Sequence, residues 1–248
     1  MCARLTGADA DGLLVIGPSK YTDVALDVFN ADGSWAERSG NGLRIAVAHA
    51  RKRSPRRKRW TISCGGDVVN AEVLRSVSGT ETTIATEVGD PIFDASRKDS
   101  PPASSPELKI LRVGKTHVSY FEVEVGNPHA VIPLRRFPRD WKTIGEHIST
   151  HKRFAQGLNV EFARIVSPRK IEVKVFERGV GPTCSSGTGA SAAVSALIAT
   201  RQVSSKVTVH FPGEDTTGHT LVVTWKDTSR PIVVSGSVRR LFELQVDA

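Results

Sequence analysis

Short runs of β-branched and other apolar residues, many of them alternating with polar positions, recur along the chain and predict strands. Clusters of Gly, Pro, Ser and Asp separate these runs. The clearest runs are residues 13–16, 60–63, 68–73, 110–113, 118–123, 160–166, 171–176, 206–211 and 220–225. Two helices are expected, beginning after Ser39 and after Ser186, and a shorter one around Trp141 to His151. Because strands outnumber helices, the pattern predicts an α+β fold rather than a doubly wound sheet.

The sequence contains an internal repeat, in which the segment from Phe29 to Ala50 aligns without a gap to the segment from Phe176 to Leu197. Six aligned pairs are identical: Phe29/Phe176, Ser39/Ser186, Gly40/Gly187, Gly42/Gly189, Ala46/Ala193 and Val47/Val194. A repeat of this kind determines the architecture of the fold. It predicts two related halves, each with one Ser-Gly-x-Gly turn that opens one apolar helix.

The Ser-Gly-x-Gly turns carry the candidate chemistry. A Ser at the N-cap accepts a hydrogen bond from the first helical turn, and the remaining N–H groups and the helix dipole favour an anion there. Glycine allows a ligand to approach the backbone. We therefore expect the two helix ends to form an anion-binding cleft between the halves. The alternative is two capped core helices whose glycines only relieve crowding.

The basic residues are concentrated in one segment. The formal net charge is +8, but the run from Arg51 to Arg59 holds seven basic residues and no acidic one, so the remainder is nearly neutral. We interpret residues 51–59 as a solvated helix C-terminus and loop. Salt-sensitive nucleic-acid binding is the alternative, but no groove-reading motif or stacking platform apart from Trp60 accompanies the run.

The composition is that of a globular protein, with 39% hydrophobic and 24% charged residues. No apolar run approaches the roughly 18 residues of a membrane span, and the N-terminus lacks the pattern of a secretory signal. Three cysteines, Cys2, Cys64 and Cys184, are too few and too scattered for a disulfide framework or a zinc site. We expect a cytoplasmic protein without membrane contact or a bound metal.

These motifs resemble those of the diaminopimelate epimerase family, and more widely the cofactor-independent racemases and isomerases built in the same way. The matching stretches are Phe29–Ser34, Ser39–Gly42, Gly126–His129, Gly157–Val160, Phe176–Gly179 and Ser186–Gly189, with Thr6–Leu14 as a further family segment. Their order and spacing fit over nearly the whole chain. The resemblance implies two pseudo-symmetric α+β domains, each a mostly antiparallel sheet around a central helix, with the active cleft between them. Expected domains are residues 1–83 with 236–248, and 84–235.

The resemblance also implies a reaction and its residues. Family members invert the α-carbon of a free amino acid, as in the conversion of LL- to meso-diaminopimelate in lysine biosynthesis, with no cofactor. One thiolate removes the α-proton and a thiol on the opposite face delivers another. The implied acid–base positions are Ser39 and Ser186, with His129 and Glu177 beside them. The implied substrate-binding residues are Asn30, Gly40, Asn41, Asn127, Asn159, Glu177, Arg178, Gly187 and Thr188.

The sequence departs from the family pattern in two respects. The two thiols are replaced by Ser39 and Ser186. A thiol pKa of about 8.5 suits acid–base catalysis near neutrality, whereas the pKa of an aliphatic hydroxyl lies far outside that range. Cys184 is not expected to substitute for Ser186, because its offset in a tight loop points it elsewhere. The family also has residues before Thr6, with a Gly-Asn-Asp-Phe turn, that this sequence does not show. We expect one strand and one ligand contact to be missing, and a homodimer is one way to cover the exposed edge.

Three functions therefore remain open. The first is an epimerase that acts on a small amino acid with carboxylate and amino groups at both ends. The second is a family member with impaired or altered chemistry, which binds an amino or carboxylic acid without racemising it. The third is nucleic-acid binding through residues 51–59. Motifs taken singly have simpler interpretations: Asn127-Pro128-His129 as a turn with a solvent-facing histidine, Glu177-Arg178 as a strand-end ion pair, and Asp32-Gly33 as turn chemistry.

Overall fold

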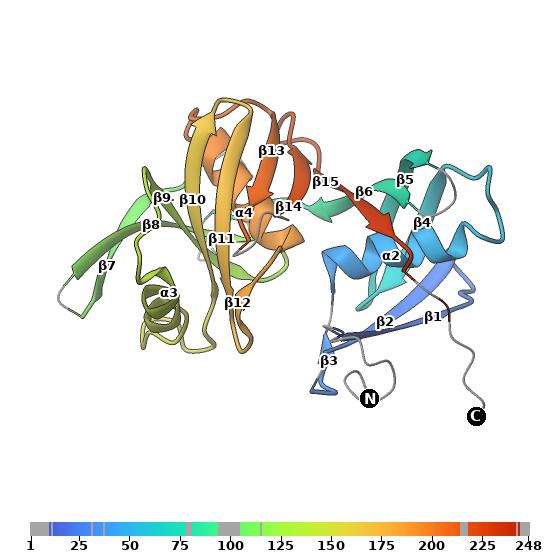
Figure 1. Ribbon diagram of the computed structural model, residues 1–248, viewed down its shortest axis with the longest axis horizontal. Helices are drawn as coiled ribbons and strands as arrows, with labels where there is room; N and C mark the ends of the chain where they lie inside the picture. Colours follow the sequence, from blue (N-terminus) through green and yellow to red (C-terminus); the bar gives the residue numbers. More distant parts are fainter. Residues whose placement is uncertain are drawn as a thin grey trace. The chain divides into compact units, whose positions relative to one another are not determined.

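The computed structural model describes residues 10, 12–30, 32–36, 38–77, 81–93, 105–114, 116–213, 218–241 and 243 (Figure 1). Residues 6–9 and 11 of the family segment Thr6–Leu14 lie outside these ranges. The chain divides into two compact units, the first formed by residues 1–87 and 235–248 and the second by residues 88–234. The boundaries predicted from the sequence are 83/84 and 235/236. Strands β6 (Glu81–Gly89) and β15 (Ile232–Arg239) contain the two points where the chain passes between units.

The first unit is a sheet with one described helix, α2 (Gly40–Ala50). Its other strands are β1 (Gly12–Gly17), β2 (Val24–Asn30), β3 (Trp35–Ala36), β4 (Arg59–Cys64) and β5 (Asp67–Val77). The strand order is β1-β2-β4-β5-β6-β15, and β3 pairs with β2. Strands β2 and β4 are parallel; the connection between them contains α2, since parallel neighbours need a crossover.

Helix α2 has one buried face. Leu43, Ala46 and Val47 are almost fully buried in the core that includes Val24 and Ile62. Apolar residues three and four positions apart share one side of a helix. The apolar helix predicted to begin after Ser39 therefore packs on the core through this face.

The second unit is a larger sheet with two described helices, α3 (Trp141–Ser149) and α4 (Gly187–Ala199). Its strands are β7 (Leu108–Val113), β8 (Thr116–Glu124), β9 (Pro128–Leu134), β10 (Asn159–Ser167), β11 (Lys170–Glu177), β12 (Gly181–Thr183), β13 (Lys206–Phe211) and β14 (His219–Thr224). The order is β15-β14-β13-β11-β10-β9-β8-β7, with β12 on β11. Two pairs are parallel, β9 with β10 and β11 with β13. Their crossovers contain α3 and α4.

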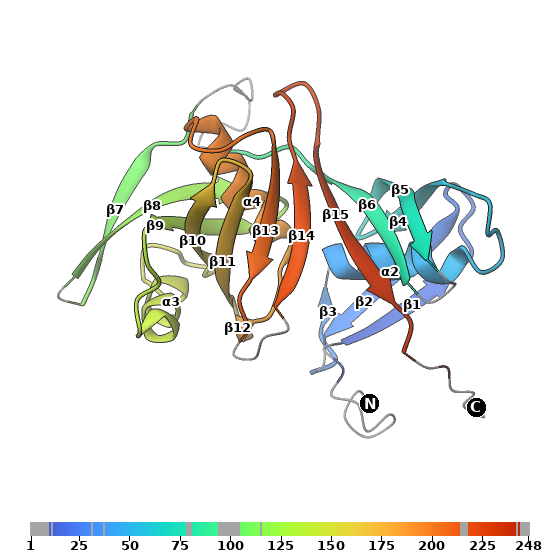
Figure 2. The same cartoon turned by 45° about the horizontal axis from the view of Figure 1, so that its top comes forward.

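Helix α4 is buried on nearly all sides. Gly189 and every residue from Ala190 to Leu197 are buried, and the helix packs on one face of the sheet against β8–β11 and β14 (Figure 2). A helix that is apolar all round belongs inside a core. Its small residues, mostly alanine and serine, let the strands approach closely.

The repeat predicted from the sequence is present in the fold. In the first unit the chain runs β2–β3–α2–β4, and in the second β11–β12–α4–β13. In both units the short strand pairs with the strand before it, and the first and last strands of the segment pair in parallel. The predicted α+β class with two related halves is confirmed.

Candidate functional site

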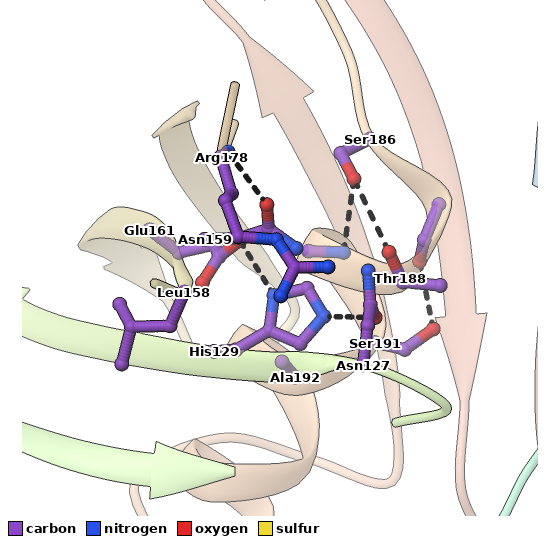
Figure 3. Close-up of polar contacts among 12 residues, drawn as sticks. Asn127, His129, Leu158, Asn159, Glu161, Arg178, Ser186, Thr188, Ser191 and Ala192 are labelled. Carbon is purple, nitrogen blue, oxygen red and sulfur yellow. Dashed lines mark hydrogen bonds and ion pairs between the residues drawn. The ribbon is translucent and has the colours of Figure 1, made fainter. Parts of the chain in front are cut away.

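The N-terminus of α4 is the centre of the candidate site in the second unit. Ser186 is the N-cap, and its hydroxyl accepts a hydrogen bond from the Gly189 N–H at 3.1 Å (Figure 3). The same hydroxyl lies 3.5 Å from that of Thr188. The N–H groups of Gly187 and Thr188 belong to the first turn, where no intrahelical acceptor is available. Together with the helix dipole, they make this end suited to an anionic group.

His129 lies near the start of β9, between two oxygen atoms. Its Nδ1 atom is 2.8 Å from Oε1 of Glu161, and its Nε2 atom is 2.7 Å from Oδ1 of Asn127 (Figure 3). The interpretation of Asn127-Pro128-His129 as a turn with a solvent-facing histidine is wrong, because His129 is 0% exposed. The strand begins at Pro128 and carries the imidazole into the core.

Glu161 is a candidate that the sequence analysis missed. Its side chain is 0% exposed, although a glutamate is rarely buried completely unless it is paired. Strands β9 and β10 are parallel with Asn159 opposite His129; Glu161, two residues on, therefore points to the same face as Asn159. Its second oxygen, Oε2, has no hydrogen-bond partner in the part of the chain that the structure describes. The one sign of Glu161 in the sequence is that an acidic residue occurs in an otherwise apolar stretch.

Glu177 lies at the end of β11, and its carboxyl group is close to the N-cap of α4. Burial raises the pKa of Glu177. A hydrogen bond with the Ser186 side chain lowers the pKa in part, as does the nearby His129, whereas the negative charge of Glu161 raises it further. A carboxyl group with a raised pKa can exchange protons closer to neutral pH than a free one. The structure thus brings Glu177 close to Ser186.

Asn159 and Arg178 are joined through the backbone. Oδ1 of the buried Asn159 accepts a hydrogen bond from the Arg178 backbone N–H at 2.9 Å, and the Arg178 guanidinium donates to the Gln156 carbonyl at 3.0 Å. The guanidinium therefore faces the loop before β10, and no Glu177–Arg178 ion pair is present among the described residues. Gly157 has a φ of +67°, and a Cβ atom there would lie 3.0 Å from the Arg178 side chain. Glycine is thus required for this packing.

The first unit repeats the cap but not its surroundings. Ser39 caps α2, and its hydroxyl accepts from the Gly42 N–H at 3.0 Å. The side-chain amide of the exposed Asn30 donates a hydrogen bond to the Ser34 hydroxyl at 2.9 Å. In the same turn, the Ser34 N–H donates to the Asp32 carboxylate at 2.9 Å. Asp32 therefore stabilises a turn, as the sequence predicts.

Arg44 is a buried cation in the first turns of α2. It is 3% exposed, and Nη2 donates to Oδ1 of Asn41 at 2.5 Å. Its Nε and Nη1 atoms lack hydrogen-bond partners in the described ranges, and burial lowers the pKa of Arg44 to about 10. The side chain reaches back along the helix to its N-terminal turn, as helical side chains do. It therefore holds Asn41, one of the predicted ligand residues.

Neither cysteine among the described residues replaces a missing thiol. Cys64 is buried at the end of β4, where it accepts a hydrogen bond from the Ser39 backbone N–H, and burial raises the pKa of its thiol. Cys184 is exposed, whereas Ser186 two residues later is buried. Hydroxyl groups therefore occupy both cap positions, and neither thiol in the described ranges lies at the position of a cap side chain.

Two further properties of the described residues bear on other functions. They contain no group of three or more His, Cys, Asp or Glu side chains arranged to hold a metal ion. They also contain no helix both long and apolar enough to cross a membrane.

Comparison with known proteins decides the family. The family model for diaminopimelate epimerase matches residues 1–91 and 121–241. The chain belongs to the diaminopimelate epimerase family. A diaminopimelate epimerase from Desulforudis audaxviator is 32% identical over 252 residues, covering 98% of this chain and 86% of that protein. One from Caldanaerobacter subterraneus subsp. tengcongensis is 33% identical over 256 residues, covering 100% and 89%.

A solved structure extends the likeness to the fold. The crystal structure of a hydroxyproline epimerase from Agrobacterium vitis aligns with a TM-score of 0.66 at 12% identity, covering 92% of this chain and 73% of that one. The resemblance stated from the motifs is confirmed, and the chain is a member of an amino-acid epimerase family. The family implies a small amino acid as substrate. The roles of single residues, the shared cleft of the two helix ends and a homodimer stay predictions.

Proposed function

We propose that this chain acts on diaminopimelate, interconverting the LL and meso forms at the α-carbon without a cofactor. Family membership over nearly the whole chain supports the reaction class. The observation that carries the proposal is the cluster at the N-terminus of α4. There lie Asn127, Asn159, Glu177 and Arg178, which the family resemblance assigns to substrate binding, and Glu177 is close to the Ser186 cap.

In this proposal the substrate carboxylate accepts hydrogen bonds from the N–H groups of Gly187 and Thr188. Arg178 supplies a positive charge at the site of the distal amino-acid group, to which the Asn127 and Asn159 side chains also belong. Fixed N–H donors stabilise negative charge without having to reorient, including the charge that develops when the α-proton leaves. Gly40 and Asn41 are the equivalent residues at the N-terminus of α2.

The proton transfer is assigned to Ser186 and Glu177 together. A serine hydroxyl is a poor base alone, and works when a neighbouring group takes its proton. The hydrogen bond between Ser186 and the Glu177 carboxyl provides that arrangement. As the α-proton moves to the Ser186 oxygen, the hydroxyl proton moves to the Glu177 carboxylate. Ser39 is the residue that the family resemblance assigns to the second acid–base position. We expect a rate well below that of a thiol-based family member, because the pKa of neither hydroxyl lies near the working pH.

The second candidate is binding without inversion, and the two hydroxyls are the observation that favours it. Both Ser39 and Ser186 accept a hydrogen bond from a helix N–H. The main role of such a hydroxyl is to cap the helix. A family member that keeps the binding residues and lacks the thiols would hold the amino acid unchanged, or catalyse a less demanding isomerisation or dehydration.

Deuterium incorporation separates the two candidates. The chain is incubated with LL-diaminopimelate in D₂O, α-deuterium is measured by mass spectrometry, and binding is measured by calorimetry. Exchange above a protein-free control supports the epimerase. Binding without exchange supports the second candidate. If neither binding nor exchange is detected, both candidate functions are overturned.

The double variant Ser39→Cys/Ser186→Cys tests the missing thiols. We expect about a 10²- to 10⁴-fold gain in exchange, the usual contribution of a matched acid–base group. Ser185→Cys is the matched control, since it places a thiol one residue from the cap. A double variant that binds but stays inert would exclude the thiols as the explanation.

A further inference from the structure

Arg44 is a buried cation whose charge is not offset by any carboxylate in the described part of the chain. The residue is 3% exposed, and none of the ion pairs between described residues includes it. Burial lowers the pKa of Arg44 to about 10, so the guanidinium still carries its charge at neutral pH. Its Nε and Nη1 atoms lack hydrogen-bond partners within the same ranges. A buried charge left unpaired in this way lowers the stability of a fold.

The Arg44 side chain makes one hydrogen bond among the described residues, and that bond fixes the amide of Asn41. Nη2 of Arg44 lies 2.5 Å from Oδ1 of Asn41. A guanidinium only donates, so the Asn41 atom that faces it is the oxygen. The Asn41 amide nitrogen then points away from Arg44, and no described residue accepts its hydrogen bond. Because Asn41 is exposed, its side-chain N–H group is open to a ligand.

The N-terminus of α2 provides further donors beside this amide. Gly40 and Asn41 open the helix, and their backbone N–H groups have no intrahelical acceptor. The helix dipole adds positive potential at this end, and Arg44 adds a full charge from inside the core. Solvent screens a buried charge far less than an exposed one. The charge of Arg44 therefore acts on whatever group the helix end binds.

The repeat shows that the helix does not require this cation. Arg44 corresponds to Ser191 in the second copy, and Asn41 corresponds to Thr188. Ser191 is 0% exposed, and its hydroxyl donates to the Gly187 carbonyl at 2.8 Å. The same cap and the same glycines thus form with a short neutral side chain at this position. A role in ligand binding, rather than in folding, accounts for a cation there.

We propose that Arg44 is a positioning residue for ligand binding: it holds the Asn41 side chain with its N–H group toward the ligand and keeps a fixed positive charge beneath the first turn of α2. The proposal rests on the proposed function only for the identity of the ligand, LL-diaminopimelate. Arg44 acts through Asn41 and through the potential at the helix end, since its own side chain is buried. The stability that the unpaired guanidinium costs is regained when an anionic ligand is bound. Functional sites commonly contain such locally unfavourable groups.

The first test is Arg44→Met in the full chain, with Arg51→Met as the matched control. Arg51 carries the same charge at the C-terminal end of α2, where a cation is favourable, and its Nη1 atom donates to the Ser76 hydroxyl at 3.0 Å. Arg44→Met should leave the urea midpoint unchanged or raise it, because an apolar side chain replaces an unpaired buried charge, whereas Arg51→Met should lower it. Affinity for LL-diaminopimelate, measured by calorimetry, should fall about 10- to 100-fold in Arg44→Met and stay unchanged in the control.

The Asn41 amide reports the positioning without any ligand. In ¹⁵N relaxation of the ligand-free protein, the Asn41 side chain should be ordered in the wild type and in Arg51→Met, and mobile in Arg44→Met. Arg44→Lys keeps a charge and should recover part of the affinity. Its affinity should also fall relative to that of the wild type as pH rises, because a buried ammonium loses its proton more readily than a guanidinium.

A second variant keeps the test decisive if Arg44→Met does not fold. Asn41→Asp gives Arg44 a carboxylate partner and removes the outward N–H group. It should raise the urea midpoint and weaken binding about 10- to 100-fold. An Asn41 side chain that stays ordered in Arg44→Met, or wild-type affinity in Asn41→Asp, overturns the proposal. If the wild type does not bind LL-diaminopimelate, the proposed function fails, and the order of the Asn41 amide still decides whether Arg44 positions it.

Discussion

The Oε1 atom of Glu161 lies 2.7 Å from the point where a Cβ atom on Gly189 would stand. Contacts this short do not occur for real Cβ atoms, so the third residue of α4 must be glycine as long as the carboxylate stays in place. The repeat explains why a glycine recurs in the motif, and the structure explains why this copy cannot accept a side chain.

Gly189→Ala should therefore destabilise the chain more than Gly42→Ala. Overpacking a core costs about 1–3 kcal/mol, and the alanine would displace the buried Glu161–His129 pair. At Gly42 the flexible end of Leu14 can move aside, and the contact with the Cβ atom of the capping serine is 3.1 Å in both copies. Urea denaturation of the two variants gives the comparison. Equal losses of unfolding free energy would mean that Glu161 moves freely.

The two capping hydroxyls should contribute equally to stability, whatever they do in catalysis. Ser39→Ala and Ser186→Ala each remove the acceptor of one first-turn N–H, which costs about 1 kcal/mol. The corresponding Ser→Thr variants should recover most of this loss. Ser185→Ala, which removes no cap, is the control in thermal and urea denaturation. A loss confined to one of the two caps would show that the other helix end has a further acceptor.

Glu177 should make stability depend on pH. Because burial raises its pKa above the ordinary value of 4.5, the carboxyl group contributes stability below that pH, and this contribution is lost as pH rises through the folded-state pKa. The unfolding free energy of the wild type minus that of Glu177→Gln should thus decline in this window and level off above it. Ser186→Ala should move the window to higher pH, since the Ser186 hydrogen bond lowers the pKa. Parallel pH profiles for the wild type and Glu177→Gln would contradict the burial effect.

The basic run should be largely irrelevant to the fold. Replacing the exposed Arg53, Arg56, Lys58 and Arg59 by glutamine should change the unfolding free energy by less than about 0.5 kcal/mol. Arg57→Gln should cost more, because Arg57 pairs with Asp23 at 2.6 Å and lies over the Trp60 ring. The same fourfold variant tests nucleic-acid binding. We expect equal, weak affinity for duplex DNA, whereas a loss of salt-dependent binding would support the third hypothesis.

The local features of this protein follow from its sequence alone. The caps at Ser39 and Ser186, the helices after them and most of the strands depend on residues a few positions apart, through i to i+3 hydrogen bonds and period-two alternation. The repeat and the motif order, which also lie in the sequence, identify the family. Strands such as β2, β6 and β9 were harder to predict, because their alternation is interrupted or their apolar run is bounded by proline.

Only the tertiary structure decided how the site is assembled. Glu161 lies opposite Val131 in the parallel register of β9 and β10, and its approach to His129, 32 residues away in sequence, depends on the crossover through α3. The same is true of Arg44, whose charge gives no sign in the sequence that the side chain is buried. Burial removes water as a partner, so the few remaining protein contacts determine the charge and orientation of each group. Such contacts arise between distant segments, and the sequence names the residues without stating which of them meet.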